Sequence, residues 1–216
     1  MVTGPSPVPD PPADCQAPRI VSRGVGEIWS HVWKAEPGRM ATTFNPGFGV
    51  GRFHPIFDRA GAPVATFYAA SHPDAAIFES VFHDVAENEP NQQIYRSKLA
   101  GLVRSNVRLS RDIALVDLTT LGRHHVRLSR VELIEPVGPD NYLRTARWAE
   151  YFLRCTSADG LIWPSRPLDT HLSILLFGRA ADAIEDAGDN TPLDAGAGLD
   201  RIYALAEEAE ILVVSA

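Results

Sequence analysis

Short apolar runs separated by turn residues restrict the fold of this chain more than any other feature. They occupy residues 28–33, 64–70, 107–118, 160–163, 171–177 and 210–215. Their content of β-branched and aromatic residues is typical of strands, and the last three runs have the turn-bounded form of buried strands. Because the runs are short and unevenly spaced, they predict one α/β (α+β) domain with a mixed β-sheet flanked by helices, rather than a regular doubly wound sheet.

Two further segments have the periodicity of amphipathic helices. Residues 71–88 read SHPDAAIFESVFHDVAEN, with Ser71 at a position suited to an N-cap and Pro73 in the first turn. The apolar residues of this segment step by three and four, and they do so again in residues 140–155. We therefore expect a helix in each segment. Residues 186–198, DAGDNTPLDAGAG, have the composition of a loop.

The N-terminal segment differs in composition from the rest of the chain. Residues 1–18 contain six prolines and almost no large apolar side chains. Such a segment cannot bury enough surface to offset the entropy lost on ordering it. We predict a Pro-rich disordered tail over residues 1–18 and one folded domain over residues 19–216.

Charge and cysteine content narrow the class of protein. The formal net charge is -7, so the overall surface does not favour direct nucleic-acid binding. Cys15 and Cys155 lie in no CxxC or Cys/His ligand pattern, which favours a reducing compartment and no disulfide, zinc or other metal site. No signal peptide and no apolar run of about 18 residues is visible, so we expect a cytoplasmic protein without membrane spans.

A glycine-rich segment at residues 44–53, FNPGFGVGRF, is the first candidate for a ligand site. It matches neither GxGxxG nor GxxxxGK[ST], but its glycines would allow close approach of a ligand, and Arg52 could bind phosphate through two nitrogens. Taken singly, Arg52 could equally be a surface residue. Tyr68 could equally be a core residue, Glu79 an exposed carboxylate, and Ser165 a backbone-capping hydroxyl.

In their order along the chain, these segments resemble the RES domain, a family named for its arginine, glutamate and serine. The resemblance covers roughly residues 25–180. The matching elements are Gly51-Arg52-Phe53, Tyr68-Ala69-Ala70, Glu79 and the stretch from Gly160 to Ser165-Arg166.

The resemblance implies a fold similar to the ADP-ribosyltransferase toxins and an NAD+-degrading toxin of a bacterial toxin–antitoxin pair. Such a toxin cleaves the nicotinamide–ribose bond as a glycohydrolase or phosphorylase, with NAD+ as substrate and no resident cofactor. The alternatives are a mono-ADP-ribosyltransferase acting on a protein, or a catalytically degenerate member that acts through antitoxin binding. The implied partner is a cognate antitoxin, an Xre-like helix-turn-helix protein, and a homodimer within the toxin–antitoxin complex is a further alternative.

The resemblance also implies roles for individual residues. Arg52, beside Gly51, would hold the NAD pyrophosphate, and Tyr68 would pack against the nicotinamide end. Glu79 would act at the ribose and Ser165 would help to orient the substrate. These residue types suit the reaction, because nicotinamide leaves as a neutral group and the positive charge that develops on the ribose is stabilised by a carboxylate.

One departure from the family pattern concerns positive charge. Family members commonly carry an earlier arginine in a strand, where this chain has Ser30 and His31. His31 could bind NAD in its place as a weaker cation, or could be a strand histidine with a satisfied ring. Lys34 and Arg39 are close enough in sequence to substitute. The arginine-rich stretch 104–130 is either a solvated face or a surface for an acidic antitoxin segment.

Overall fold

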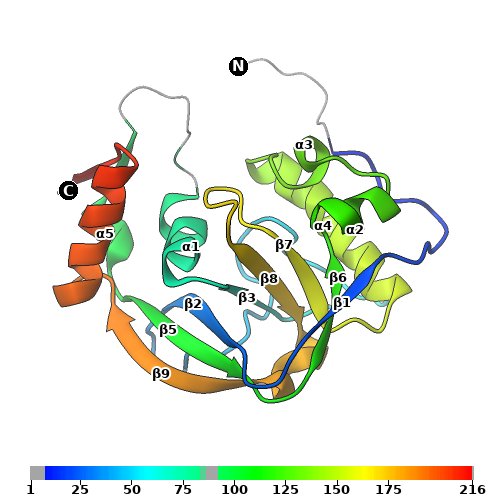
Figure 1. Ribbon diagram of the computed structural model, residues 1–216, viewed down its shortest axis with the longest axis horizontal. Helices are drawn as coiled ribbons and strands as arrows, with labels where there is room; N and C mark the ends of the chain where they lie inside the picture. The colour runs from blue at the N-terminus through cyan, green and yellow to red at the C-terminus, as the bar shows by residue number, and fades with distance from the viewer. Residues whose placement is uncertain (1–7, 84, 86–91, 216) are drawn as a thin grey trace.

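The computed structural model describes residues 8–83, 85 and 92–215, and its centre is a strongly curled sheet of eight strands (Figure 1). The strand order across this sheet is β1-β6-β7-β8-β3-β2-β5-β9, and a separate two-stranded sheet joins β10 to β4. The strand bounds are β1 Ile20–Arg23, β2 Ile28–Lys34, β3 Thr66–Ala70, β4 Gln93–Tyr95, β5 Leu102–Leu109, β6 Ile113–Asp117, β7 Gly160–Pro164, β8 Leu172–Phe177, β9 Ile184–Pro192 and β10 Leu212–Val214.

Strand pairing makes the large sheet a mixed one. β6 and β7 are parallel, and every other neighbouring pair in the sheet is antiparallel. Parallel neighbouring strands need a long crossover connection, and the segment between β6 and β7 supplies it with three helices. The predicted α/β class with one mixed sheet is therefore confirmed.

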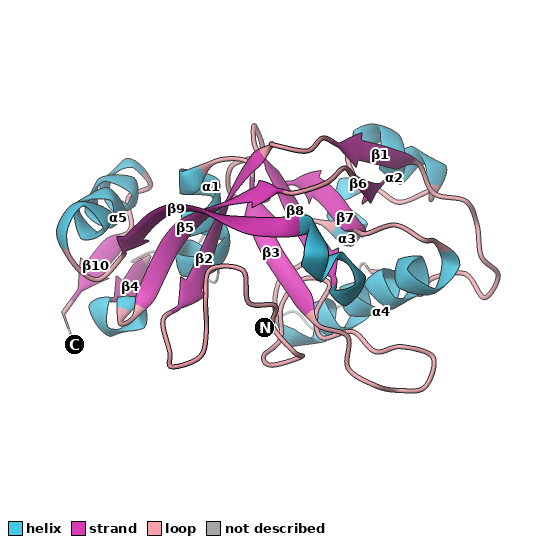
Figure 2. Ribbon diagram, turned by 90° about the horizontal axis from the view of Figure 1, so that it is seen from below, coloured by secondary structure: helices cyan, strands magenta, loops and turns pink. Residues whose placement is uncertain are grey.

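The helices lie at both ends of the sheet and within its curve. In Figure 1, α1 lies between α5 on one side and the group α2–α4 on the other, and Figure 2 shows the same arrangement from below. α1 contacts β2, β3, β5 and β8, which places the following turn close to the centre of the sheet. The helical bounds are α1 Pro73–Ile77, the π-helical turn η1 Phe78–Phe82, η2 Arg96–Leu99, α2 Thr120–His125, α3 Arg130–Leu133, α4 Pro139–Cys155, η3 Gly178–Ala183 and α5 Gly196–Glu208.

Most predicted elements form where the pattern places them. The runs at 28–33, 64–70, 160–163 and 171–177 are β2, β3, β7 and β8, and residues 140–155 lie in α4. The run 107–118 is not one strand, because β5 ends at Leu109 and β6 begins at Ile113 on the other side of the sheet. The run 210–215 forms β10, whose side chains are partly exposed rather than buried.

Residues 186–198 were expected to be a loop, and this expectation is wrong. They contain most of β9, which pairs with β5 at the edge of the sheet, and the start of α5. An edge strand with exposed side chains can be rich in polar residues, and its pairing with β5 is interrupted by register shifts. Long-range backbone pairing therefore overrides the local loop composition.

The helix predicted from residue 71 begins one residue later than expected. His72, not Ser71, is the N-cap, and its Nδ1 accepts a hydrogen bond from the backbone N–H of Asp74. The α-helical part ends at Ile77, and the π-helical turn η1 continues to Phe82. Residues 84 and 86–88 of the predicted helix lie outside the described residues.

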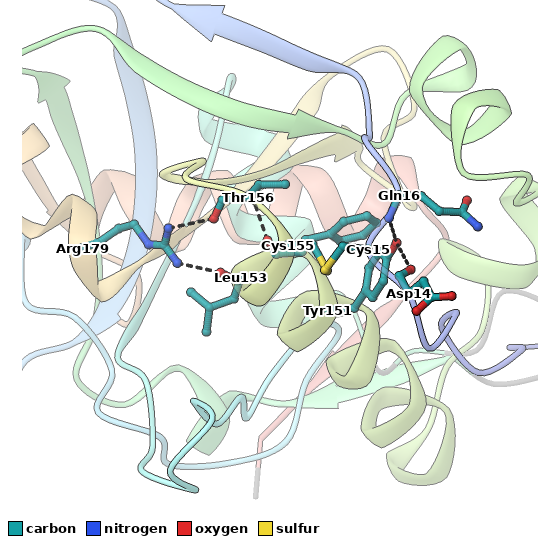
Figure 3. Close-up of a disulfide and its surroundings, with 9 residues drawn as sticks. Asp14, Cys15, Gln16, Tyr151, Leu153, Cys155, Thr156 and Arg179 are labelled. Atoms are coloured by element: carbon teal, nitrogen blue, oxygen red, sulfur yellow. Dashed lines mark hydrogen bonds between the residues drawn. A yellow bond between two sulfur atoms is a disulfide. The ribbon is translucent and has the colours of Figure 1, made fainter.

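The N-terminal segment packs on the domain from residue 8 onwards. Val8 is 1% exposed and belongs to the core cluster around α4, and the indole N–H of Trp148 donates to the carbonyl of Pro9 at 2.8 Å. Figure 3 shows Cys15 joined to Cys155 at the end of α4 by a disulfide. The predicted disordered tail is therefore wrong for residues 8–18, while residues 1–7 lie outside the described part of the chain.

The disulfide corrects a second expectation. The absence of a CxxC pattern gave no sign that Cys15 and Cys155 lie next to each other, because 140 residues separate them in sequence. Hydrogen bonds of Tyr151 reinforce the link: its hydroxyl accepts from the backbone N–H of Gln16 at 2.6 Å and donates to the carbonyl of Asp14 at 3.3 Å (Figure 3). The cysteine content therefore does not support a reducing compartment. None of the helices in the described residues is both long and apolar enough to cross a membrane.

Candidate active site

A cavity of about 400 Å³ opens between β2, β3, the segment before β3 and the π-helical turn η1. This volume lies within the range of small-molecule sites. Five of the six predicted site residues line it, namely His31, Gly51, Arg52, Tyr68 and Glu79. The sixth, Ser165, is fully buried behind the cavity wall and contacts Glu79. The structure thus brings together residues from five separate parts of the sequence.

A tight turn directs Arg52 into the protein instead of into solvent. The backbones of Gly51 and His54 pair with each other, and Phe53 adopts a positive φ of 63°. Two contacts from distant elements hold this turn: the hydroxyl of Thr145 on α4 accepts from the Phe53 N–H at 3.1 Å, and the hydroxyl of Tyr68 on β3 donates to the Arg52 carbonyl. Arg52 is consequently only 8% exposed, so it is not a solvated surface arginine.

The guanidinium of Arg52 is incompletely paired in its buried position. Nη2 donates to the carbonyl of Pro136 at 3.4 Å, and the group lies 5.9 Å from the centre of the Tyr142 ring. Within the described residues, Nε and Nη1 are buried without a hydrogen-bond partner. Burial lowers the pKa of Arg52, although the nearby Glu79 carboxylate opposes this, and the side chain stays protonated at neutral pH. A buried cation with unused donors is suited to an anionic ligand.

The Glu79 carboxylate is held through one of its two oxygens. Glu79 lies in η1, and π-helical turns occur frequently at functional sites. Oε1 accepts hydrogen bonds from the Ser165 hydroxyl at 2.8 Å, the Arg166 N–H at 3.0 Å and the Ser173 hydroxyl at 3.4 Å. In the described part of the chain, Oε2 accepts none, so the carboxylate is fixed in orientation while one oxygen remains available to a ligand.

Ser165 and Tyr68 each have a supporting contact that sequence alone could not reveal. Ser165 orients Glu79 and accepts a 3.4 Å hydrogen bond from the Leu168 N–H, so its hydroxyl acts through the carboxylate. Burial raises the pKa of Tyr68 above its usual range, so the phenol remains neutral and its hydroxyl stays on the Arg52 carbonyl. The ring of Tyr68 lies edge-on to Trp163 with centroids 6.2 Å apart, and it forms part of the cavity wall.

His31 has a satisfied ring and carries no charge at neutral pH. Its Nδ1 lies 2.6 Å from the backbone carbonyl of Tyr68, so this nitrogen carries the hydrogen and donates it. Burial lowers the pKa of His31 to about 4 despite this hydrogen bond, and the ring packs on Phe67 with centroids 4.2 Å apart. His31 can therefore offer Nε2 as an acceptor to a ligand, but it does not replace an arginine as a cation.

The cations near His31 and those of the arginine-rich stretch differ in their surroundings. Lys34 and Arg39 line the cavity, and each is 3.5 Å from a carboxylate oxygen of Glu36.

In the arginine-rich stretch, several side chains have acidic partners within the protein. The pairs are Arg104–Asp189, Arg108–Glu185, Arg111–Asp159, Arg111–Asp182 and Arg130–Glu135. This pairing reduces the positive charge available to an acidic segment, and Arg123 of the same stretch is buried, so the stretch is not one solvated face.

Sequence reasoning missed two residues of the site. Ser173 on β8 donates to Glu79, and Tyr142 on α4 faces the Arg52 guanidinium. A buried serine within the apolar run 171–177 is the one local sign that could have pointed to Ser173. Tyr142 gave no sign, because its position on the helix is equally that of a core residue. No group of three His, Cys, Asp or Glu side chains in the described ranges is arranged to bind a metal ion.

Comparisons with known proteins bear on the family and the fold. The family model of the RES domain matches residues 28–195. A chain in the crystal structure of the MbcT–MbcA toxin–antitoxin complex of M. tuberculosis has a similar fold, with a TM-score of 0.54 and 16% sequence identity. The similarity covers 87% of this chain and 91% of that chain. No curated protein matches the sequence.

Proposed function

This chain belongs to the RES domain family, and we propose that it is an NAD+-degrading toxin of a bacterial toxin–antitoxin pair. The similar chain in the MbcT–MbcA toxin–antitoxin complex supports the toxin role. On this proposal NAD+ is consumed as substrate, and the physiological partner is an antitoxin of the Xre-like helix-turn-helix type. The cytoplasm is the proposed place of action, although a disulfide such as Cys15–Cys155 is rare in that compartment.

The observation that carries the proposal is that Arg52 and Glu79 line the same cavity. Arg52 offers two unused buried donors, and Glu79 offers a carboxylate oriented by three hydrogen bonds. A dinucleotide requires both groups, because its diphosphate is anionic and the ribose to be attacked becomes cationic. Arg52 would bind the diphosphate, which places the ribose next to it at Glu79.

The chemical step needs no general acid. The bond between C1′ of the ribose and the pyridinium nitrogen breaks, its electron pair passes to nitrogen, and neutral nicotinamide leaves. The positive charge left on the ribose is stabilised by the Glu79 carboxylate. Water or phosphate then attacks C1′, and an attacking water loses its proton to the carboxylate or to solvent. Ser165 and Ser173 keep the carboxylate in place throughout.

Nicotinamide release by the Glu79→Gln variant tests the proposal. Glutamine keeps the shape of the side chain and removes its charge, so we expect the rate to fall by a factor of about 100 to 1000. Nicotinamide would be measured by chromatography after incubation of the purified protein with NAD+, with and without phosphate. Glu185→Gln is the matched control, because Glu185 is an exposed residue of β9 paired with Arg108.

Two results would contradict the proposal. Absence of nicotinamide release by the wild-type protein in both buffers would exclude NAD+ cleavage to water or phosphate. An unchanged rate in Glu79→Gln would exclude this carboxylate as the catalytic group. If labelled NAD+ transfers its ADP-ribose to a protein instead, the reaction is a mono-ADP-ribosyl transfer at the same site.

A further inference from the structure

Phe48 is an exposed aromatic side chain at the mouth of the cavity. It is 76% exposed and yet belongs to the cavity lining, four residues before Arg52 in the glycine-rich segment. An exposed phenylalanine on a flexible loop would require no explanation, because isolated apolar residues are common on protein surfaces. The backbone around Phe48, however, is firmly held.

The side chains of Asn45 and His54 fix the backbone of Phe48. The Asn45 amide accepts from the Phe48 N–H and donates to the Phe48 carbonyl, both at 2.8 Å. His54 Nε2 donates to the same carbonyl at 2.9 Å, and the Thr66 hydroxyl donates to His54 Nδ1 at 2.9 Å. Both supporting residues are tied to β3, because Asn45 also pairs with the backbone of Thr66. The exposed ring therefore stands on a turn anchored to the strand that carries Tyr68.

The glycines on either side of Phe48 are required by this turn. Gly47 and Gly49 have φ angles of 126° and 83°, which L side chains rarely adopt. A Cβ at Gly47 would also lie 3.2 Å from the Cβ of Pro63. The two glycines therefore allow the turn that holds the backbone of Phe48 at the edge of the cavity.

We propose that Phe48 is a stacking surface for the purine ring of the bound dinucleotide. This inference rests on the proposed function, which places the nicotinamide ribose at Glu79 and the diphosphate at Arg52. Because Arg52 is buried and Phe48 is exposed on the same cavity wall, the adenosine half extends from Arg52 towards the mouth. There the flat face of Phe48 is available, and an aromatic side chain stacks on any base with little reorganisation when its position is already fixed.

Binding of ADP-ribose to the Phe48→Ala variant tests this inference. We expect the dissociation constant, measured by calorimetry on the purified chain, to rise roughly ten-fold or more. Phe48→Tyr should keep the affinity, because it keeps the aromatic face. Nicotinamide mononucleotide, which lacks the adenosine half, should bind wild type and Phe48→Ala equally. Phe57→Ala is the matched control, since Phe57 is an exposed phenylalanine between the glycine-rich segment and β3 and is not among the residues that line the cavity.

The outcomes separate this inference from the proposed function. If wild type binds ADP-ribose but releases no nicotinamide from NAD+, NAD+ cleavage fails, while the comparison of Phe48→Ala with wild type still decides the stacking role. An unchanged ADP-ribose affinity in Phe48→Ala overturns the inference, and weaker binding of a protein partner in the same variant would assign the ring to an interface. Equal loss of nicotinamide mononucleotide and ADP-ribose binding also overturns it, because the effect would then lie at Arg52 or Glu79.

Discussion

Replacing Arg52 by methionine should stabilise the free protein and abolish dinucleotide binding. Burial opposes the charge of Arg52, and this effect exceeds the attraction of Glu79, because the pKa of the guanidinium is lowered overall. Two of its buried nitrogens have no partner in the described residues. Methionine fills a similar volume without charge or hydrogen-bond donors, so the free protein loses a buried group that is poorly satisfied.

The size of the effect follows from the contacts of Arg52. Two unpartnered nitrogens cost about 2 kcal/mol each, so their removal stabilises the protein by about 4 kcal/mol. The variant loses a long hydrogen bond to Pro136, the contact with the Tyr142 ring and the attraction of Glu79, together about 3 kcal/mol. The net gain of about 1 kcal/mol corresponds to a rise of about 2–4 °C in Tm for a chain of this length.

Binding should change in the opposite direction and by more. Two charge-assisted hydrogen bonds to a diphosphate are worth about 3–6 kcal/mol, so the affinity for ADP-ribose should fall by a factor of about 100 to 10,000. Thermal unfolding and calorimetry on Arg52→Met would measure the two effects. Arg108→Met is the control, because Arg108 forms an exposed ion pair whose loss should change neither quantity noticeably. A lower Tm together with unchanged ADP-ribose affinity would refute the reasoning, since Arg52 would then be a structural residue.

Two further predictions concern stability. Cys15→Ser should lower the free energy of unfolding by about 3–5 kcal/mol, because the disulfide closes a loop of 140 residues. Urea unfolding with and without reductant measures this loss. Equal unfolding midpoints of the wild-type protein in the two conditions would contradict the prediction. The pKa of His31 is about 4 in the folded protein and 6.5 in its ordinary state, so the unfolded chain binds more protons between these values. Stability should therefore fall by up to about 3 kcal/mol between pH 7 and pH 4. This loss should be smaller in His31→Gln, and an equal loss in both proteins would show that His31 is not its source.

The sequence predicted those parts of the fold that depend on local pattern. β2, β3, β7, β8 and α4 form where apolar runs or helical periodicity place them, because each buries its apolar side chains in the core. It failed where distant segments decide the structure. β9 is a strand because β5 pairs with it, and residues 8–18 are ordered because Val8 packs under α4 and Cys15 is bonded to Cys155.

The site shows the same division between local and long-range information. The order of Arg52, Tyr68, Glu79 and Ser165 was sufficient to name candidates, because that order resembles the RES domain although no single residue is specific. Their environment was not predictable. The burial of Arg52 depends on Thr145 and Tyr68, which are distant in sequence. The orientation of Glu79 depends on the turn after β7 and on β8.

His31 shows how the structure decides between two interpretations that the sequence left equal. A histidine at the place of a missing arginine could have supplied positive charge, or could have been a strand residue with a satisfied ring. Burial and the donated hydrogen bond to the Tyr68 carbonyl leave the ring neutral above a pKa of about 4. Charge for the ligand at neutral pH must then come from elsewhere in the cavity lining. Among the described residues of that lining, Arg52 has buried donors without a hydrogen-bond partner, and for this reason its replacement should separate binding from stability.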